Sequence, residues 1–388
     1  MSDLYISEQV KYVGVNDYDI DLFEIQYPVP NGISYNSYVI LDEKVAILDT
    51  VDRRKTDEWL VKVDAALEGR LPDYLVIHHL EPDHAGNIQI LCKKYPNMKI
   101  VSNKKLLSML PQFFDMDFSA RQLEVSEGDT LSLGEHVLTF VMAPMVHWPE
   151  AMVSYESKDK ILFSADGFGK FGTLDCEEDW TCEARRYFIN IVGKYGAQVQ
   201  ALLKKAAGLD IQIICPLHGP ILKENLGYYI EKYDIWSIYR PEDDGILVAY
   251  GSIHGHTAAA AKKMAEILTA KGCKKVVLCD LARDSMSEAI EDAYRYGRLI
   301  IAAATYDGAI FPCVEDFVYH LKIKNFQNRK VGIIQNGSWA PVSGRLLTEA
   351  FEKMKNITIC EPMVTIRSAM KEANIPEMEA LADAILAE

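Results

Sequence analysis

Two imidazoles and two carboxylates fall within the short stretch from residue 79 to residue 84. They are His79, Glu81, Asp83 and His84, and they follow the apolar run 74–77. A strand end that opens into a loop lets side chains converge on one point. A single metal ion rarely takes four ligands from so short a stretch. Burying these groups without a metal would cost much desolvation free energy, so the pattern predicts two adjacent metal ions.

Three more ligand-type residues each follow a separate apolar run, in a loop that contains glycine or proline. They are His147, Asp166 and His218. One histidine after a strand is more often a hydrogen-bonded structural residue than a ligand, but the repeated placement favours ligation. The chain also contains three histidines that we interpret as structural: His78, His136 and His320.

The donor set indicates which metal would bind. Three carboxylates with three or four imidazoles and no thiolate fit a dinuclear iron or manganese centre better than a closed structural zinc site. Asp166 is the one carboxylate distant in sequence from the first cluster. It could bridge both ions.

A second group of residues suits a phosphate and a planar ring. The loop 251–257 joins an apolar strand to a helix, and the backbone N–H groups of a helix N-terminus bind anions. Two further loops, 304–309 and 336–341, follow other parallel strands, and ligands bind at that edge of such sheets. Trp339 could stack on a ring there. The predicted binding residues are Ser252, Ile253, His254, Gly255, His256, Thr257, Thr305, Tyr306, Asp307, Gly308, Asn336, Gly337, Ser338, Trp339 and Ala340.

The elements that carry these residues divide into two predicted domains, 1–242 and 243–388, joined by the polar, breaker-rich link 240–245. The first domain mixes short strands (22–27, 37–41, 45–48, 74–77, 99–101, 137–141, 161–163 and 211–214) with helices (57–67, 104–114 and 183–207). The second alternates apolar strands (246–250, 275–278, 299–303, 331–334 and 363–366) with helices (257–270, 287–296, 314–321, 343–354 and 376–387). This alternation predicts a doubly wound parallel sheet.

Bulk properties narrow the function classes. Of 388 residues, 49% are hydrophobic, which is enough for a large core, and the net charge of −15 disfavours nucleic acid or an anionic membrane as partner. The eight cysteines show no C-x-x-C spacing, which indicates a reducing, cytoplasmic setting. We expect no signal peptide and no apolar run long enough to span a bilayer.

The ligand cluster resembles the signature of the metallo-β-lactamase superfamily, His-x-His-x-Asp-His, with Glu81 in place of the second histidine. That replacement, with a downstream histidine, aspartate and histidine, resembles the flavodiiron proteins, whose site holds two non-haem irons. The resemblance implies that His79, Glu81 and His147 bind one iron, that Asp83 and His218 bind the other, and that Asp166 bridges them. In that family the residue at His84 can be a ligand or swing away. Tyr195 matches a tyrosine near the family's substrate pocket and is the candidate catalytic residue.

The three loops of the second domain resemble those of flavodoxins, except that His254 and His256 stand where small hydroxyl or amide residues are common. The implied fold is an α/β chain: a metallo-β-lactamase-like αββα sandwich followed by a flavodoxin-like sheet of five parallel strands that binds FMN. The implied activity is reduction of O2 to water or NO to N2O. Electrons would come through FMN from a separate carrier such as rubredoxin, or from a reduced deazaflavin. A head-to-tail homodimer or a dimer of dimers is also implied.

Two other functions remain open at this point. A zinc-dependent hydrolase of the lactamase fold would prefer histidine at position 81, and metal analysis separates it from the iron enzyme. A pure electron carrier would have lost its metal, which the complete ligand set disfavours. The sequence leaves the preference between O2 and NO, the identity of the donor and the choice of dimer or tetramer undecided.

Overall fold

The computed structural model describes residues 4–387 and divides into two compact units. The first unit runs through Phe188 and resumes over Tyr195–Asp234. The second takes Ile189–Lys194 and the chain from Ile235 onward. The division therefore does not follow a single cut in the sequence, because a short segment within the first unit's stretch of chain belongs to the second.

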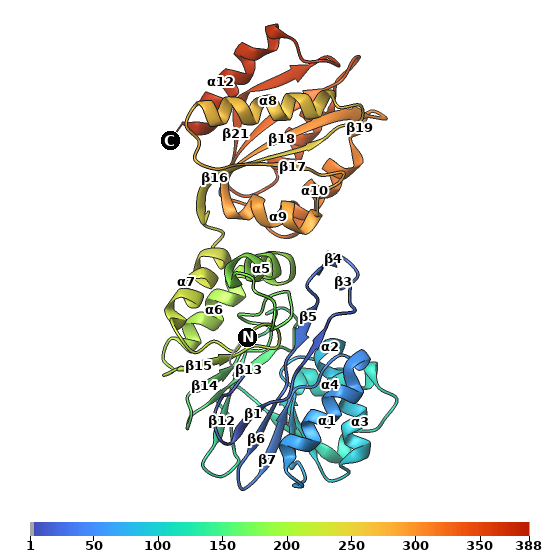
Figure 1. The fold of residues 1–388 in the computed structure, drawn as a ribbon, viewed down its shortest axis with the longest axis vertical. Coiled ribbons are helices and arrows are strands. Elements are labelled where there is room, and N and C mark those ends of the chain that lie inside the picture. Colours follow the sequence, from blue (N-terminus) through green and yellow to red (C-terminus); the bar gives the residue numbers. More distant parts are fainter. Residues whose placement is uncertain (1–3, 388) are drawn as a thin grey trace. The chain divides into compact units, whose positions relative to one another are not determined.

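Two β-sheets form the centre of the first unit (Figure 1). The first sheet has the order β1 (Val10–Tyr12), β6 (Tyr38–Leu41), β7 (Val45–Leu48), β8 (Tyr74–Val76), β9 (Lys99–Asn103) and β10 (Gln122–Val125). The second has the order β11 (Thr130–Ser132), β12 (Val137–Met142), β13 (Met152–Glu156), β14 (Ile161–Phe163) and β15 (Ile213–Cys215). Strands β7 to β10 run parallel, as do β14 and β15.

Apolar side chains from both sheets make one core. Ile40, Leu48 and Val76 of the first sheet belong to the same buried cluster as Phe140 and Phe163 of the second. Helices α1 (Thr56–Leu67), α3 (Ile88–Lys94) and α4 (Lys104–Phe113) lie outside the first sheet, and α6 (Gly196–Ala206) and α7 (Leu226–Ser237) lie beside the second (Figure 1). The expected αββα sandwich is confirmed.

Two expected elements of this unit are wrong in detail. The strand expected over 22–27 is a hairpin of β3 (Leu22–Phe23) and β4 (Tyr27–Pro28), because Glu24 and Ile25 turn the chain with positive φ angles of 48° and 57°. The helix expected over 183–207 is interrupted. It consists of α5 (Trp180–Tyr187), a π-helical stretch (Phe188–Val192), a 3-10 turn (Gly193–Tyr195) and then α6. Two glycines at this break weaken continuous helix.

The second unit is a parallel sheet with helices on both faces. Its strand order is β17 (Val276–Asp280), β16 (Asp243–Gly251), β18 (Tyr296–Tyr306), β20 (Arg329–Asn336) and β21 (Ile357–Ile366), and the short β19 (Ala309–Ile310) pairs with β18. Helices α8 (His256–Ala270) and α12 (Ile375–Leu386) cover one face, and α9 (Met286–Arg295) and α10 (Pro312–Ile323) lie on the other (Figure 1). Helix α11 (Ser343–Phe351) follows β20. The order 2-1-3-4-5 is that of the flavodoxin-like fold, as expected.

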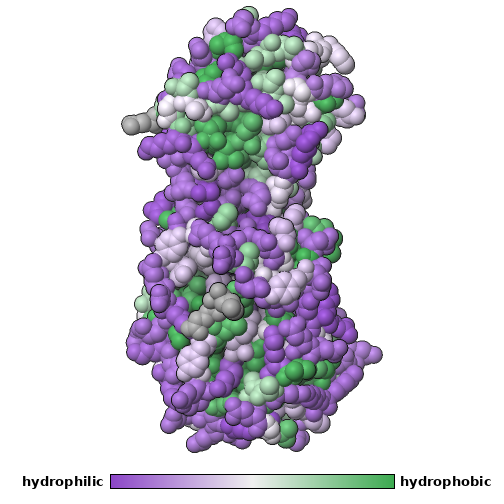
Figure 2. Space-filling view, viewed as in Figure 1, coloured by the Kyte–Doolittle hydropathy of each residue, from purple (hydrophilic) through white to green (hydrophobic). Residues whose placement is uncertain are grey.

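Hydrophilic residues cover most of the face that Figure 2 shows, with smaller hydrophobic patches between them. Within residues 4–387, no helix combines the length and apolar character that a membrane crossing requires.

Candidate metal centre and cofactor cavity

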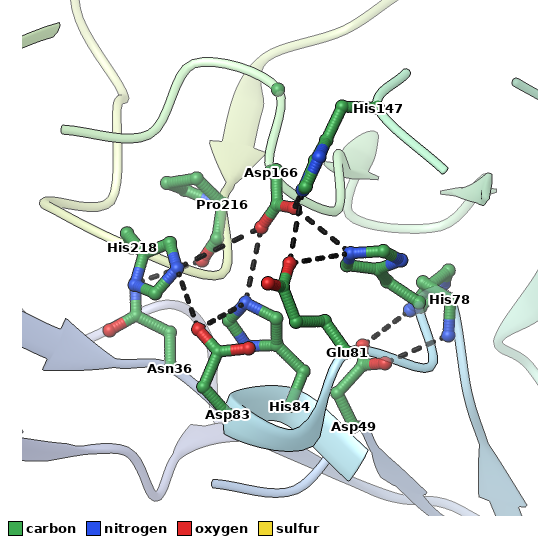
Figure 3. Close-up of polar contacts among 12 residues, drawn as sticks. Asn36, Asp49, His78, Glu81, Asp83, His84, His147, Asp166, Pro216 and His218 are labelled. Atoms are coloured by element: carbon green, nitrogen blue, oxygen red, sulfur yellow. Dashed lines mark hydrogen bonds and ion pairs between the residues drawn. The ribbon is translucent and has the colours of Figure 1, made fainter. Parts of the chain in front are cut away.

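The structure brings four of the predicted ligands into one group. Ligand atoms of His79, Glu81, His147 and Asp166 all lie within 4.8 Å of one another. Glu81 Oε2 lies 3.1 Å from Nε2 of both His79 and His147. The histidines come from the loops after β8 and β12, and Glu81 caps the short helix α2 (Pro82–Ala85). Three loops far apart in sequence thus meet at one point (Figure 3).

The other three predicted ligands form a second group beside the first. Ligand atoms of Asp83, His84 and His218 lie within 4.8 Å of one another, and all three side chains are buried. Asp83 Oδ2 is 3.3 Å from Nε2 of both His84 and His218. His84 therefore points into the second group, beside the two residues expected to hold the second ion.

Asp166 faces both groups with different oxygens. Its Oδ2 lies 3.2 Å from His147 Nε2 and 3.4 Å from His79 Nε2. Its Oδ1 lies 3.1 Å from His84 Nε2 and 3.9 Å from His218 Nε2. This is the arrangement that a carboxylate shared between two metal ions requires (Figure 3).

Hydrogen bonds made by Nδ1, the ring nitrogen that faces away from the site, fix the orientation of two ligand histidines. His79 Nδ1 donates to Glu150 Oε1 at 2.9 Å, and the same oxygen accepts from Leu80 N at 3.0 Å. His218 Nδ1 donates to the Ser34 carbonyl at 2.7 Å. Each bond leaves Nε2 of the ring directed into the site. Such second partners set the tautomer and raise the basicity of a metal-ligating histidine.

The site has buried polar atoms that the protein itself does not satisfy. Within residues 4–387, both oxygens of Asp83, Asp166 Oδ1, and Nε2 of His84, His147 and His218 have no hydrogen-bond partner, although each is excluded from solvent. All of these atoms but Asp83 Oδ1 make the ion-pair contacts given above. Orphaned groups of this kind are costly unless something else binds them. A pair of cations would satisfy all of them at once, so the residues fit a dinuclear metal centre.

The mutual attraction of these groups shifts their pKa values. Burial opposes protonation of His147, but its ion pairs with the Asp166 and Glu81 carboxylates outweigh burial and raise the pKa of His147 to about 9. Burial pushes the pKa of Asp166 up, yet the neighbouring histidines hold it well below its ordinary value. Asp166 therefore remains ionised and ready to bind cations, and metal binding must displace a proton from His147.

Aromatic residues that the sequence analysis missed surround the second group. The rings of Phe23, Tyr35 and Tyr187 have centroids 5.4, 5.9 and 5.5 Å from that of His218. Burial, followed by the charges of the site's carboxylates, raises the pKa of Tyr187 well above 10, so its phenol stays protonated. By contrast, Tyr195 lies in the 3-10 turn that leads into α6. The catalytic role of Tyr195 stays a prediction.

Glu150 and the hairpin residue Phe23 could not have been singled out from the sequence. Glu150 lies directly after the His147 loop, but an isolated glutamate carries no signal that it will fold back against His79. Phe23 belongs to the segment expected to be an extended strand. Only the turn at Glu24 and Ile25 brings the hairpin to the site.

Two histidines that the sequence analysis read as structural have structural partners. His78 bonds Asp49 Oδ2 at 2.6 Å and Ser154 Oγ at 2.7 Å. His136 bonds Asp42 Oδ2 at 2.7 Å, with Asp159 Oδ2 at 3.4 Å on its other side. The third, His320, lies on α10 of the second unit, with Nε2 3.6 Å from Asp316 Oδ1.

The second unit has a cavity of about 670 Å³ at the carboxyl ends of its strands. Every predicted flavin-binding residue lines it except Gly255, and the sequence analysis missed three further lining residues: Ala304, Val342 and Ser368. Gly255 lies at the N-cap of α8 with φ +87°, and its N–H donates to Ser252 Oγ at 3.1 Å. That conformation suits glycine and shapes the loop at the helix N-terminus.

Trp339 is the feature of this cavity that most calls for a ligand. It lines the cavity, yet its side chain is 82% exposed, and Tyr306 on another lining loop is 44% exposed. Leaving two large rings in water forgoes their burial energy. A planar aromatic ligand bound between the loops would cover both, so the cavity fits a flavin.

Comparison with known proteins agrees with this geometry. A family model described as ODP family beta lactamase matches residues 33–219. The chain is 29% identical over 390 residues to the rubredoxin-oxygen oxidoreductase of Megalodesulfovibrio gigas, covering 96% of this chain and 95% of that protein. It is 26% identical over 349 residues to the anaerobic nitric oxide reductase flavorubredoxin of Vibrio vulnificus, covering 87% of this chain and 70% of that protein.

Solved structures show the same likeness over nearly the whole chain. The rubredoxin oxygen:oxidoreductase of Desulfovibrio gigas superposes with a TM-score of 0.91 at 26% identity, covering 98% of this chain and 97% of that one. The flavodiiron protein of Giardia intestinalis gives a TM-score of 0.90 at 25% identity, covering 99% and 96%. With the two ligand groups and the cavity in the expected places, these matches show that the chain belongs to the flavodiiron protein family.

Proposed function

We propose that this protein is an oxidoreductase that reduces O2 to water, or NO to N2O, at a dinuclear iron centre, with electrons delivered through FMN. The observation that carries the proposal is the placement of Asp166 between two groups of imidazole and carboxylate donors. The donor set favours iron over a hydrolytic zinc pair, because Glu81 supplies an oxygen where zinc hydrolases of this fold use an imidazole. The relatives' printed names point to the same gases.

In this proposal His79, Glu81 and His147 would hold one iron, Asp83, His84 and His218 would hold the other, and Asp166 would be shared between them. The ions supply the redox chemistry and the binding of the gas. The chain's residues keep the ions in place and the pocket dry. Glu150 and the Ser34 carbonyl orient two of the ligand rings, and the apolar rings around His218 limit the access of water.

Tyr187 has a further part in this arrangement. Its ring lies against His218 and its phenol remains neutral, so it can donate a hydrogen bond beside the second group of ligands. The expected catalytic role of Tyr195 remains a separate proposal.

The flavin would bind in the cavity of the second unit, with its phosphate at the loop 252–257 and its ring between the loops that carry Tyr306 and Trp339. We expect a separate electron donor, a rubredoxin-like protein or a reduced deazaflavin. We also expect a head-to-tail homodimer or homotetramer in which the flavin unit of one chain serves the metal unit of another. We also propose a cytoplasmic setting, which the eight free cysteines support.

Anaerobic expression followed by metal and flavin counts tests the proposal. The expected result is two irons and one FMN per chain, with turnover of at least one gas from reduced rubredoxin. An Asp166→Ala variant should lose iron and turnover but keep FMN. Native protein that carries zinc and hydrolyses an ester or lactam would overturn the proposal and favour the hydrolase. Bound FMN without iron or gas turnover would favour a pure electron carrier.

A further inference from the structure

A second cavity, of about 210 Å³, lies behind the second sheet of the first unit, between strands β12–β15 and helices α6 and α7. Its wall is almost wholly aliphatic, with Val153 and Leu162 contributed by the sheet and Val199 and Leu203 by α6. Neither the metal ligands nor the flavin loops account for this space. A cavity of this size beside a close-packed sheet calls for a ligand or a reason for its cost.

The few polar groups on the wall are satisfied by the protein. Ser164 Oγ donates to the Gly167 carbonyl at 2.6 Å, and Tyr233 accepts from Phe168 N at 2.5 Å. A buried water needs two to four polar partners, and apolar cavities without them stay dry. The cavity therefore suits an apolar occupant rather than water.

The cavity is lined by the chain neighbours of two of the metal ligands. Its wall includes Val146, which immediately precedes His147, and Gly167, which immediately follows Asp166. Val146 is 4% exposed. The wall also includes Ile230 on α7, whose side chain is 38% exposed. The cavity is thus bordered both by a partly exposed apolar side chain and by the loops that carry two of the metal ligands.

We infer that this cavity collects small apolar gas molecules and delivers them to the metal centre. The inference rests on the proposed function, because it assigns O2 or NO as the occupant. Both gases are small and weakly hydrated, so they partition from water into an apolar space. The volume decides against larger ligands: an engineered apolar cavity of roughly 150 Å³ binds one benzene or xenon, so this one holds a few diatomic molecules but no flavin or acyl chain.

Xenon is the direct probe, because it is apolar, comparable in size to a gas substrate and visible by diffraction. Crystals of the protein loaded with metal and FMN should show xenon between Val199, Leu203 and Ile230 under moderate gas pressure. Absence of xenon from this cavity, while it binds elsewhere in the same crystal or nowhere, would overturn the inference. This result does not depend on turnover, so it stands apart from the fate of the proposed function.

A pair of variants on α6 tests delivery. Val199→Phe fills the cavity, whereas Ala201→Phe adds similar bulk on the exposed face of the same helix. Val199→Phe should lose the xenon and show a several-fold lower kcat/KM for the gas, with kcat at saturating gas unchanged. Ala201→Phe should change neither value. An unchanged kcat/KM in a folded, xenon-free Val199→Phe protein would contradict delivery. If that variant does not fold, the presence or absence of xenon in this cavity of the unmodified protein tests the inference instead.

Discussion

The bond from His79 to Glu150 gives the sharpest prediction about the metal centre. Glu150 is buried, and its Oε1 accepts from both His79 Nδ1 and Leu80 N. In Glu150→Ala the ring loses the partner that fixes its tautomer, and removal of such a partner typically weakens metal affinity about 10–100-fold. That range corresponds to about 1.4–2.7 kcal/mol.

The same substitution also leaves the Leu80 N–H buried without its acceptor, which costs about 1–3 kcal/mol of folding stability. A matched control separates the two effects. Glu156 is equally buried and accepts two backbone N–H groups, from Lys158 at 2.7 Å and Asp159 at 2.8 Å. Its ligand-type neighbours are His136 and Asp159, so it lies apart from the two groups that Asp166 joins. Glu156→Ala should therefore lower stability by a comparable amount and leave metal affinity unchanged.

Metal affinity is measured by titrating each protein with a chelator and counting the bound metal at each step. Folding stability is measured separately, by denaturant unfolding of the metal-free proteins. Glu150→Gln is the informative intermediate: it can still accept from Leu80 N but carries no charge, so it should recover most of the stability and only part of the metal affinity. FMN content should stay constant in all three variants, since the flavin cavity is in the other unit. If Glu150→Ala and Glu156→Ala retained metal equally well, the orienting role of Glu150 would be refuted.

Three further predictions follow from other contacts. His79→Ala should abolish gas reduction with FMN still bound, whereas His320→Ala should keep both; turnover in an iron-poor His79→Ala protein would contradict the ligand assignment. Trp339→Ala should weaken FMN binding by roughly 1–3 kcal/mol, by analogy with aromatic stacking on bases. Tyr319→Ala, which changes an exposed ring outside the cavity, should leave FMN binding unchanged. If Trp339→Ala kept the flavin content and flavin reduction potential of the unmodified protein, the stacking role would be contradicted. Burial raises the pKa of Asp42, but bonds from His136 outweigh it and hold that pKa below its ordinary value. Its contribution to stability is therefore present above the unfolded-state pKa of about 3.9 and lost as pH falls through the folded value. Asp42→Asn should destabilise most at neutral pH and least in acid, measured by denaturant unfolding across that range, and a pH-independent difference would argue against the charge.

The sequence predicted the site best where a ligand-type residue directly follows an apolar run with the pattern of a buried strand. Strand ends followed by His147, Asp166 or His218 pointed to one site because parallel and neighbouring strands end at a common edge. The five strand-helix units of the second half predicted both the sheet and the loops that line its cavity. Local patterns of this kind need no knowledge of distant contacts.

What escaped the sequence depends on long-range packing. Glu150 looks like any loop glutamate until the fold places it behind His79, and Tyr187 sits in a helix whose end could not be located. The break after Tyr187 arises where α5 passes into π-helical and 3-10 turns, a change that helical periodicity does not reveal. The hairpin at Glu24 depends on two residues with positive φ that have ordinary β-forming neighbours.

The six residues from Ile189 to Lys194 have a consequence for how such a chain can be recombined. They pack with the second unit, where Tyr239 donates to the Gly193 carbonyl at 2.8 Å and Asn325 donates to the Lys194 carbonyl at 2.8 Å. A chimera that exchanges the C-terminal half with that of a relative must therefore import these six residues as well. Grafts joined only near position 242 would leave acceptors of one parent facing donors of the other.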